Sequence, residues 1–409
     1  MDGLLKEEDG IAAHFRYDPI KHTYVTFGTS FPDLVSQTTR VCLYELDADT
    51  FKPSNVIDRD AFDQQEHSPM TTSASSTLEQ PKFFLNLPGV VLIHDFILTE
   101  NYVVFTWVKA ALDPFRTMKA LLGFGAISGT MAIPEDSETV LLLIPRSMMA
   151  GSDLRPIDFT DDGNICIDAL ADDRITRIEL PFSFNFHFGN GYETRASNGD
   201  RQLIFDMMRT SEDKDFDFAI HSSNNSNKPV WETLQPEDVP VGDMTRHIVN
   251  LDMKQLQEDP IVLCEQSPEF PAVPRHVSSR PHRYTYTLAT NKKTPSHLSK
   301  PMWGAHSAIT KIDATTPGKY ETWSFDSDEF VGEPTMVRKQ GADPDKEDAC
   351  YVMTTVSKVS TGTTDIAIMD VEGEGALERG PVCRLRLPEF LPYSALHGAF
   401  HEGVVYDFD

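Results

Sequence analysis

The sequence is poor in cysteine and in basic residues, and each shortage excludes classes of protein. Its 409 residues include only five scattered cysteines with no CxxC pair: Cys42, Cys166, Cys264, Cys350 and Cys383. This pattern is typical of free thiols in a reducing compartment and argues against a thiolate metal site. Lys and Arg total 36 against 63 Asp and Glu, giving a formal charge of −27. We therefore expect no nucleic-acid partner, because such partners require basic patches.

Long apolar runs are also missing. No stretch of 18 uninterrupted apolar residues could span a bilayer. The first ten residues, MDGLLKEEDG, are acidic and contain no apolar core of a secretory signal. Hydrophobic residues still make up 40% of the chain, which is an ordinary globular composition. These features predict a cytoplasmic protein whose membrane contact, if any, is peripheral.

Most of the chain reads as short strands bounded by Gly, Pro, Asn or Asp and rich in β-branched and aromatic residues. Examples are KHTYVTFG (21–28), RVCLYELD (40–47), KFFLNLP (82–88), NYVVFTWV (101–108), TVLLLIP (139–145), RYTYTLA (283–289), CYVMTTVSKV (350–359) and DIAIMDV (365–371). Antiparallel meanders of this number predict a propeller or a large sandwich. WD40 and kelch signatures are missing, and no linker divides the chain, so we expect one domain over residues 1–409.

Residues 107–133, WVKAALDPFRTMKALLGFGAISGTMAI, are the best helical candidate, interrupted at Pro114. Two interpretations remain open for this segment. It is either a helix that covers the sheet core or an apolar patch that contacts a membrane. Only three basic residues could meet lipid head groups there: Lys109, Arg116 and Lys119.

The thirteen histidines divide by context. Seven lie beside polar or turn residues and are expected in solvent: His22, His67, His221, His276, His282, His297 and His401. His247 and His306 stay undecided. Four others adjoin small or apolar residues: His14, His94, His187 and His397. The run FSFNFHFGNGYE around His187 fits a core histidine as well as a metal ligand, and its alternating Phe184, Phe186 and Phe188 predict a face opposite His187.

No local rule links the four histidines, so only a closed architecture could bring them together. Four neutral imidazoles would suit divalent Fe, Zn, Cu or Ni. Ligand imidazoles usually donate their other N–H to a carboxylate that fixes the ring. Glu269 in SPEFPAVP and Glu333 in FVGEPTMV are candidates for that role, although a surface loop is the alternative for each.

Six stretches in order carry a resemblance: IAAHFRYDPIKHTYVTFG (11–28), IHDFILTENYVVF (93–105), FNFHFGNGYE (184–193), EFPAVPRHVSSRPHRYTYTLA (269–289), DEFVGEPTMV (328–337) and LPYSALHGAF (391–400). Together they resemble the carotenoid cleavage oxygenases, a family that includes apocarotenoid and β-carotene oxygenases, retinoid isomerases and stilbene-cleaving enzymes. The match runs from about residue 10 to 403.

The resemblance implies an all-β, seven-bladed β-propeller with a helical or loop cap over an axial non-haem Fe(2+). The iron would be held by His14, His94, His187 and His397, with Glu269 orienting His187 and Glu333 orienting His397. The implied activity is a dioxygenase that cleaves a conjugated C=C bond of a carotenoid or apocarotenoid with O2, giving two carbonyl products. The partners would be an apolar polyene or stilbenoid and O2, and no organic cofactor is needed.

One departure from the family pattern is the short stretch before His14. Family members carry a longer segment there, with a third glutamate that partners the second histidine, so the chain is expected to be N-terminally truncated and the propeller incomplete in its first blade. Glu7 and Glu8 lie in no matching motif and are not assigned that role. Three alternatives stay open: a stilbenoid-cleaving dioxygenase, a retinoid isomerase-hydrolase, and a catalytically silent carotenoid-binding protein.

Overall fold

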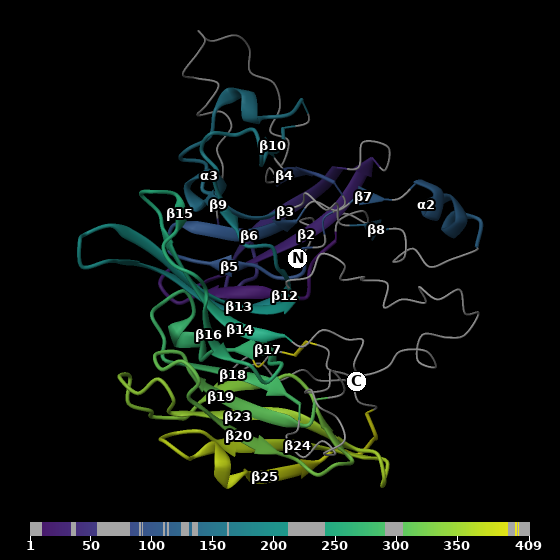
Figure 1. Ribbon diagram of the computed structural model, residues 1–409, viewed down its shortest axis with the longest axis vertical. Helices are drawn as coiled ribbons and strands as arrows, with labels where there is room; N and C mark the ends of the chain where they lie inside the picture. The colour runs from purple at the N-terminus through teal and green to yellow at the C-terminus, as the bar shows by residue number, and fades with distance from the viewer. Residues whose placement is uncertain are drawn as a thin grey trace.

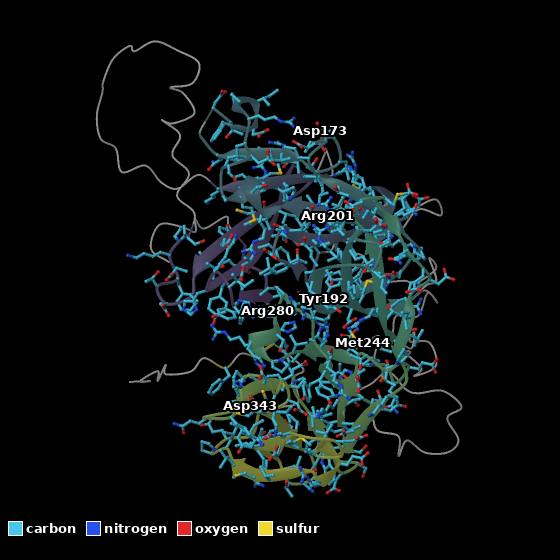
Figure 2. The ribbon with its side chains drawn as sticks, turned by 90° about the vertical axis from the view of Figure 1, so that its left-hand side faces the viewer. Asp173, Tyr192, Arg201, Met244, Arg280 and Asp343 are labelled. Carbon is cyan, nitrogen blue, oxygen red and sulfur yellow. The ribbon has the colours of Figure 1, made fainter. Side chains whose placement is uncertain are left out.

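The computed structural model describes residues 10–33, 38–54, 82–89, 91, 93–108, 111–112, 114–123, 131–132, 138–161, 163–211, 242–290, 306–391, 397–398 and 400. These residues are almost entirely β. Five sheets of four or five strands follow one another along the long axis in chain order (Figure 1). Figure 2 shows the same order from the side, with Asp173 near one end, Tyr192 and Arg280 near the middle, and Asp343 toward the other end.

The first two sheets come from the N-terminal half. The first has the order β1-β2-β3-β4-β10, with β1 Phe15–Asp18, β2 Thr23–Asp33, β3 Thr38–Asp47, β4 Phe83–Pro88 and, parallel to β4, β10 Ile165–Asp168. The second has the order β11-β9-β6-β5, with β5 Ile97–Leu98, β6 Tyr102–Val108, β9 Thr139–Pro145 and β11 Thr176–Leu180.

The remaining three sheets follow the same plan. The third comprises β12 Phe184–Arg195, β13 Arg201–Ser211, β14 Asp243–Asn250, β15 Gln255–Leu256 and β16 Ile261–Cys264. The fourth comprises β17 Glu269–Ala272, β18 Tyr284–Ala289, β19 Ala308–Asp313 and β20 Tyr320–Ser324. The fifth comprises β21 Glu329–Val331, β22 Thr335–Arg338, β23 Cys350–Lys358, β24 Thr363–Asp370 and β25 Pro381–Arg386. The strands expected from the sequence are confirmed.

Consecutive sheets pack face to face through apolar cores. One core joins the first two sheets through side chains such as Phe27 and Phe105, and another joins the second and third through Leu141 and Phe205. Further cores link the third sheet to the fourth and the fourth to the fifth. Alternating apolar residues therefore bury both faces of the inner sheets. This is how the blades of a β-propeller pack, as the sequence predicts.

Within each of the five sheets, the strand that comes first in the sequence lies at the sheet edge: β1, β5, β12, β17 and β21. Strand β12 lies against both β5 and β17, and β1 lies against β5. The contact between β5 and β12 requires a glycine, because a Cβ at Gly191 would lie 2.2 Å from Cγ2 of Ile97. These edge strands therefore converge, and the residues on them or next to them meet.

Helical structure is sparse in the described part of the chain. It consists of α2 Pro114–Leu121, α3 Arg146–Met149 and the 3-10 turns η2 Pro156–Asp158, η4 Arg275–Val277 and η5 Leu377–Arg379. The helix expected within 107–133 is real but starts at Pro114 instead of being interrupted there. Proline is well suited to the first helical turn, where its missing N–H has no partner to lose. Residues up to Val108 extend β6, and the short pair β7 Ala111–Leu112 and β8 Met131–Ala132 flanks the helix.

Candidate metal centre

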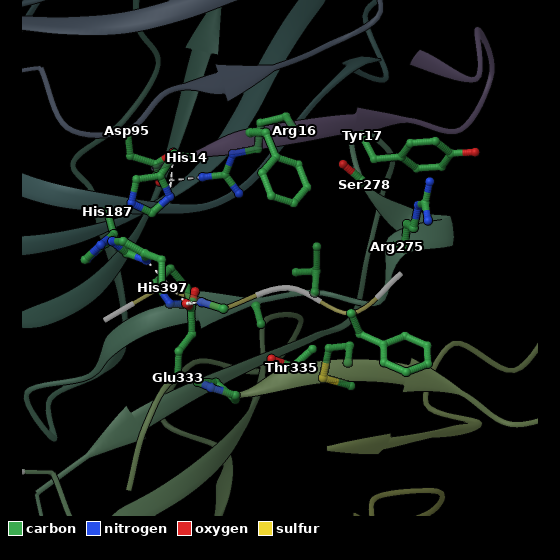
Figure 3. Close-up of a pocket in the computed structure, with 18 of the residues that line it drawn as sticks. His14, Arg16, Tyr17, Asp95, His187, Arg275, Ser278, Glu333, Thr335 and His397 are labelled. Carbon is green, nitrogen blue, oxygen red and sulfur yellow. Dashed lines mark hydrogen bonds and ion pairs between the residues drawn. The ribbon is translucent and has the colours of Figure 1, made fainter. Parts of the chain in front are cut away.

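Four imidazoles meet where the edge strands converge. His14 immediately precedes β1, His94 lies three residues before β5, His187 lies within β12, and His397 is near the C-terminal end of the described chain. One nitrogen from each ring lies within 4.8 Å of those of the other three. Figure 3 shows His14, His187 and His397 gathered at one end of a pocket, beside Asp95 and Glu333.

The cluster has the donor set that a divalent metal requires. Nε2 of His14 and Nε2 of His187 are buried and have no hydrogen-bond partner. The Nε2 atoms of His94 and His397 are 3.2 Å apart. Adjacent ligands of a metal bonded to nitrogen at about 2.1 Å would be about 3 Å apart. Buried polar atoms without a partner are costly, so the residues present fit a metal better than they fit simple packing.

Two glutamates fix the orientation of two of the rings. Oε2 of Glu269 lies 2.6 Å from Nδ1 of His187. Oε2 of Glu333 lies 3.3 Å from Nδ1 of His397 and accepts a 2.8 Å hydrogen bond from the backbone N–H of Gly398. With Nδ1 engaged by a carboxylate, Nε2 is the nitrogen left to face the cluster.

A strained residue next to Glu269 brings an aromatic ring to the same site. The backbone of Phe270 has a φ of 52°, which non-glycine residues rarely adopt. This conformation breaks the strand alternation, so that Glu269 and Phe270 both reach His187 instead of facing opposite sides. The Phe270 ring lies 4.8 Å from the His187 ring and 5.2 Å from that of His397. The ring therefore packs against both imidazoles.

A buried carboxylate that was not expected from the sequence lies on the opposite side of the cluster. Asp95, only 4% exposed, has Oδ1 3.6 Å from Nδ1 of His14. Its Oδ2 accepts hydrogen bonds from Arg16 Nη2 at 2.5 Å and from the Phe188 backbone N–H at 2.8 Å. Burial alone would raise the pKa of Asp95, but the Arg16 guanidinium and nearby imidazoles hold it below the ordinary value.

Arg16 extends this pairing to β12 and to the segment that precedes β5. Its guanidinium also donates to the backbone carbonyl oxygens of Phe96, Phe188 and Gly189, at 2.9, 2.9 and 3.1 Å. Arg16 is two residues from His14, Asp95 directly follows His94, and Phe188 directly follows His187. The Arg16–Asp95 pair therefore ties together the segments that carry three of the four histidines. An acidic residue inside the apolar run VVLIHDFIL was the signal that could have revealed it.

The pKa values of the imidazoles are shifted in different directions. Burial lowers the pKa of His14 to about 3, against the opposing effect of Asp95. Burial and the neighbouring imidazoles also lower the pKa of His94. Burial acts the same way on His187, but the hydrogen bond and charge of Glu269 outweigh it and raise its pKa. His14 and His94 are thus held as neutral bases, the form that binds metals.

The cluster opens into a cavity of about 200 Å³. His14, His187 and His397 line one end, and Tyr17 and Arg275 line the other (Figure 3). The space between them provides room for a ligand beside the imidazoles.

Two expectations about individual side chains were wrong. The stretch from Phe184 to Phe188 is not the regular strand that was expected, because the pairing of β12 with β13 shifts register between Asn185 and Phe188. The rings of Phe184 and Phe186 lie 4.9 Å apart, whereas the ring of Phe188 packs 6.3 Å from that of Phe205. The ring of Phe186 instead lies 5.7 Å from that of His94.

His282, expected in solvent, is buried and lies 3.0 Å from Oδ2 of Asp206. His22 is half exposed as expected, and His276 is only partly so. The undecided His247 and His306 are both buried. Four other histidines lie outside the described residues: His67, His221, His297 and His401.

Blade-like sheets around a four-histidine cluster define the class of protein, and comparison with known sequences gives the family. The family described as "Retinal pigment epithelial membrane protein" matches residues 1–402. The chain therefore belongs to this family, and the resemblance to the carotenoid cleavage oxygenases is confirmed.

Curated relatives carry matching names. The chain is 23% identical over 326 residues to "Carotenoid cleavage dioxygenase 7, chloroplastic" of Arabidopsis thaliana, covering 75% of this chain and 48% of the relative. It is 22% identical over 319 residues to "9-cis-epoxycarotenoid dioxygenase NCED6, chloroplastic" of the same plant, covering 77% of this chain and 44% of that protein. The chain spans about half the length of these relatives.

Solved structures agree on the fold. A single-site variant of Synechocystis apocarotenoid oxygenase superposes with a TM-score of 0.66 at 21% identity, covering 96% of this chain and 65% of that one. Cobalt-substituted Synechocystis apocarotenoid oxygenase gives a TM-score of 0.65 at 22% identity, covering 96% and 66%. These likenesses establish the β-propeller class. Among the described residues, no helix has the length and apolarity needed to traverse a bilayer.

Proposed function

We propose that this protein is a non-haem Fe(II) dioxygenase that cleaves a conjugated C=C bond of a carotenoid or apocarotenoid with O2, giving two aldehyde or ketone products. The observation that carries the proposal is the cluster of four imidazoles in which Nε2 of His14 and Nε2 of His187 are buried without a partner and lie beside a cavity. The family membership and the names of the relatives support the same chemistry.

In this proposal His14, His94, His187 and His397 hold the iron. Ferrous iron bound by neutral nitrogen ligands supplies the capacity to bind and activate O2. Glu269 and Glu333 keep His187 and His397 turned toward the metal through their hydrogen bonds to Nδ1.

The other side chains around the cluster control position and access. The Arg16–Asp95 pair holds the backbone on either side of the site in register. The rings of Phe186 and Phe270, next to His94 and His187, keep water from the imidazoles. The cavity then determines which double bond of a polyene lies beside the cluster.

The test is incubation of the iron-loaded protein with β-carotene, with an apocarotenal and with a hydroxystilbene, with the products identified by mass. We expect paired carbonyl products from a carotenoid or apocarotenoid, and none from metal-free protein or from His187→Ala. Cleavage of the hydroxystilbene alone would favour the stilbenoid alternative. In a parallel incubation with a retinyl ester, release of an isomerised retinol would favour the isomerase-hydrolase. Stoichiometric iron with no turnover of any substrate would favour a silent carotenoid-binding protein.

We also propose a peripheral membrane contact through α2. Phe115, Met118 and Leu122 are 68%, 60% and 65% exposed. Their spacing places Phe115 and Met118 on one side of α2, with Leu122 continuing that side in the turn that follows the helix. Figure 1 shows α2 projecting from the side of the stacked sheets. Replacing the three residues by serine should reduce co-sedimentation with phosphatidylcholine vesicles. Ile157→Ser provides the control, because Ile157 is 85% exposed on a different surface turn. Equal binding by the triple variant and the control would contradict the contact.

A further inference from the structure

A second cavity, of about 410 Å³, adjoins the one at the histidine cluster. The two share the lining residues Tyr17, Arg275, Met336 and Phe400. In Figure 3, Tyr17 and Arg275 lie at the end of the first cavity that is remote from the histidines. A ligand that occupies the first cavity beside the imidazoles would therefore extend toward the second.

The second cavity is basic in a protein whose net charge is −27. Arg275, His276 and Arg338 line it, and none of the described residues in its wall is an Asp or Glu. Neither arginine forms an ion pair within the described chain, whereas Arg16, Arg146 and Arg246 each do. His22, which also lines the cavity, is paired with the exposed Asp49, whose Oδ1 is 3.1 Å from His22 Nε2.

Three donor atoms in this cavity lack partners. Nε of Arg275, Nε2 of His276 and Nη1 of Arg338 are buried without a hydrogen bond. Arg275 is held in place by the Tyr17 ring, 3.8 Å from its guanidinium carbon. Arg338 is held by the backbone oxygen of Asp343, to which its Nη2 donates at 3.0 Å. The side chains are thus positioned by contacts that leave one polar edge of each unused.

Among the described residues, no acidic group beside His276, the third donor, offsets the positive charge of the neighbouring arginines. Burial, together with the positive charges of Arg338 and Arg280, lowers the pKa of His276 to about 4. An anion with two acceptor oxygens would satisfy the unused donors, because guanidinium groups bind carboxylates through paired hydrogen bonds.

We infer that this second cavity is a subsite for the carboxylate of an apolar chain, such as an apocarotenoid acid, whose polyene lies in the first cavity. The polyene part of the inference rests on the proposed function, whereas the carboxylate subsite rests on Arg275 and Arg338. Each arginine is expected to contribute about tenfold to the affinity for the acid, equivalent to about 1.4 kcal/mol.

The test compares binding of retinoic acid and of methyl retinoate to the metal-free full chain, measured by isothermal calorimetry. We expect the acid to bind at least about tenfold more tightly than the ester, which has the same polyene without the charge. Arg338→Met should remove about tenfold of the affinity for the acid and leave that for the ester unchanged. Arg338→Lys should retain part of the preference, because it keeps the charge but loses the paired geometry.

The matched control is Arg195→Met. Arg195 is exposed on β12 and, like Arg338, donates to a backbone carbonyl, that of Gly199. It should leave both affinities unchanged. Equal affinities of acid and ester for the wild-type chain, or an equal loss of both in Arg338→Met, would overturn the inference. Palmitate binding as tightly as retinoic acid would overturn the polyene acid as the occupant in favour of a saturated fatty acid.

The binding assay needs no turnover, so its outcome is independent of the proposed reaction. A preference for the acid together with no cleavage of any carotenoid would contradict only the proposed dioxygenase activity. Cleavage of an apocarotenal without any preference for the acid would contradict only the inferred carboxylate subsite.

Discussion

The two sides of the histidine cluster are built differently. His187 lies within the 12-residue strand β12, is 5% exposed, and has a carboxylate 2.6 Å from its Nδ1. His94 precedes the two-residue strand β5, and within the described residues its only hydrogen-bond partner is Nε2 of His397, a neighbour in the cluster. Burial disfavours the protonated form of both rings, and the pKa of His94 is lowered. For His187, the hydrogen bond and charge of Glu269 outweigh burial, and its pKa is raised.

This difference indicates which part of the site is formed before metal arrives. The Glu269–His187 pair is fixed by a long strand and a short hydrogen bond, whereas His94 depends on its backbone neighbours. Asp95, next to His94, is the residue that fixes that backbone, through the Phe188 N–H of β12. We expect the metal itself to complete the ordering of the His94 ring.

The largest expected effect separates the two histidines directly. His187→Ala should lower iron affinity by more than about 100-fold, because it removes a ligand and also leaves the partly buried Glu269 without its partner. His94→Ala should lower iron affinity by a smaller factor, since no carboxylate loses its partner when this ring is removed. Iron per chain, measured by mass spectrometry after dialysis against graded chelator, checks this. An equal loss in both variants would contradict the asymmetry.

The next comparison concerns the two glutamates. Glu269→Gln should lower iron affinity by about 10- to 100-fold, as expected for a carboxylate bonded to a ligand imidazole. Glu333→Gln should cost less, because its oxygen is 3.3 Å from Nδ1 of His397, against 2.6 Å for the Glu269–His187 pair. Cobalt titration followed by visible absorption would rank the two. A larger loss from Glu333→Gln would show that contact length does not govern the site.

Asp95 is expected to act as a positioning residue. Asp95→Asn should destabilise the chain and lower metal affinity by about tenfold, because it loosens the three segments that carry histidines. Asp206→Asn is the matched control: Asp206 is also a buried carboxylate paired with an arginine, Arg246. It should lower the free energy of unfolding without changing metal affinity relative to folded protein. Loss of affinity in both variants would assign Asp95 a purely structural role.

The last prediction tests whether neutral buried histidines outside the cluster make the fold sensitive to acid. Burial and the Arg209 charge lower the pKa of His247 to about 4. A base whose pKa is depressed on folding contributes full stability above its unfolded pKa of about 6.5 and loses it as the pH falls toward the folded value. Between pH 7 and pH 5 this loss is about 2 kcal/mol.

His247→Phe removes this titration and keeps the stacking on Phe205, whose ring lies 4.8 Å away. Urea unfolding at pH 7 and pH 5 should show the variant losing about 2 kcal/mol less than the wild type. Identical losses would mean that His247 is accessible to protons in the folded state.

The sequence allowed prediction of the strands and of the residues that could form the site, for physical reasons. Period-two alternation and turn residues located strands such as β6 and β9. Four histidines were candidates for the site because they adjoin small or apolar residues. The start of α2 was misjudged because Pro114 was taken as an interruption, whereas proline is favourable at a helix start.

What sequence alone could not supply was register and long-range pairing. The irregular pairing of β12 with β13 moved Phe186 next to His94, and no local pattern signals such a shift. The Arg16–Asp95 pair joins residues 79 positions apart, and the Arg275–Arg338 cavity joins a turn to a strand edge. Such constellations arise only when the sheets pack.

The most direct test of the central claim is anomalous X-ray scattering from crystals of the iron-loaded protein, recorded on both sides of the iron absorption edge. The account predicts one anomalous peak surrounded by Nε2 of His14, His94, His187 and His397, with Glu269 and Glu333 behind the rings. A peak elsewhere in the chain, or none between these four nitrogens at full iron loading, would contradict it.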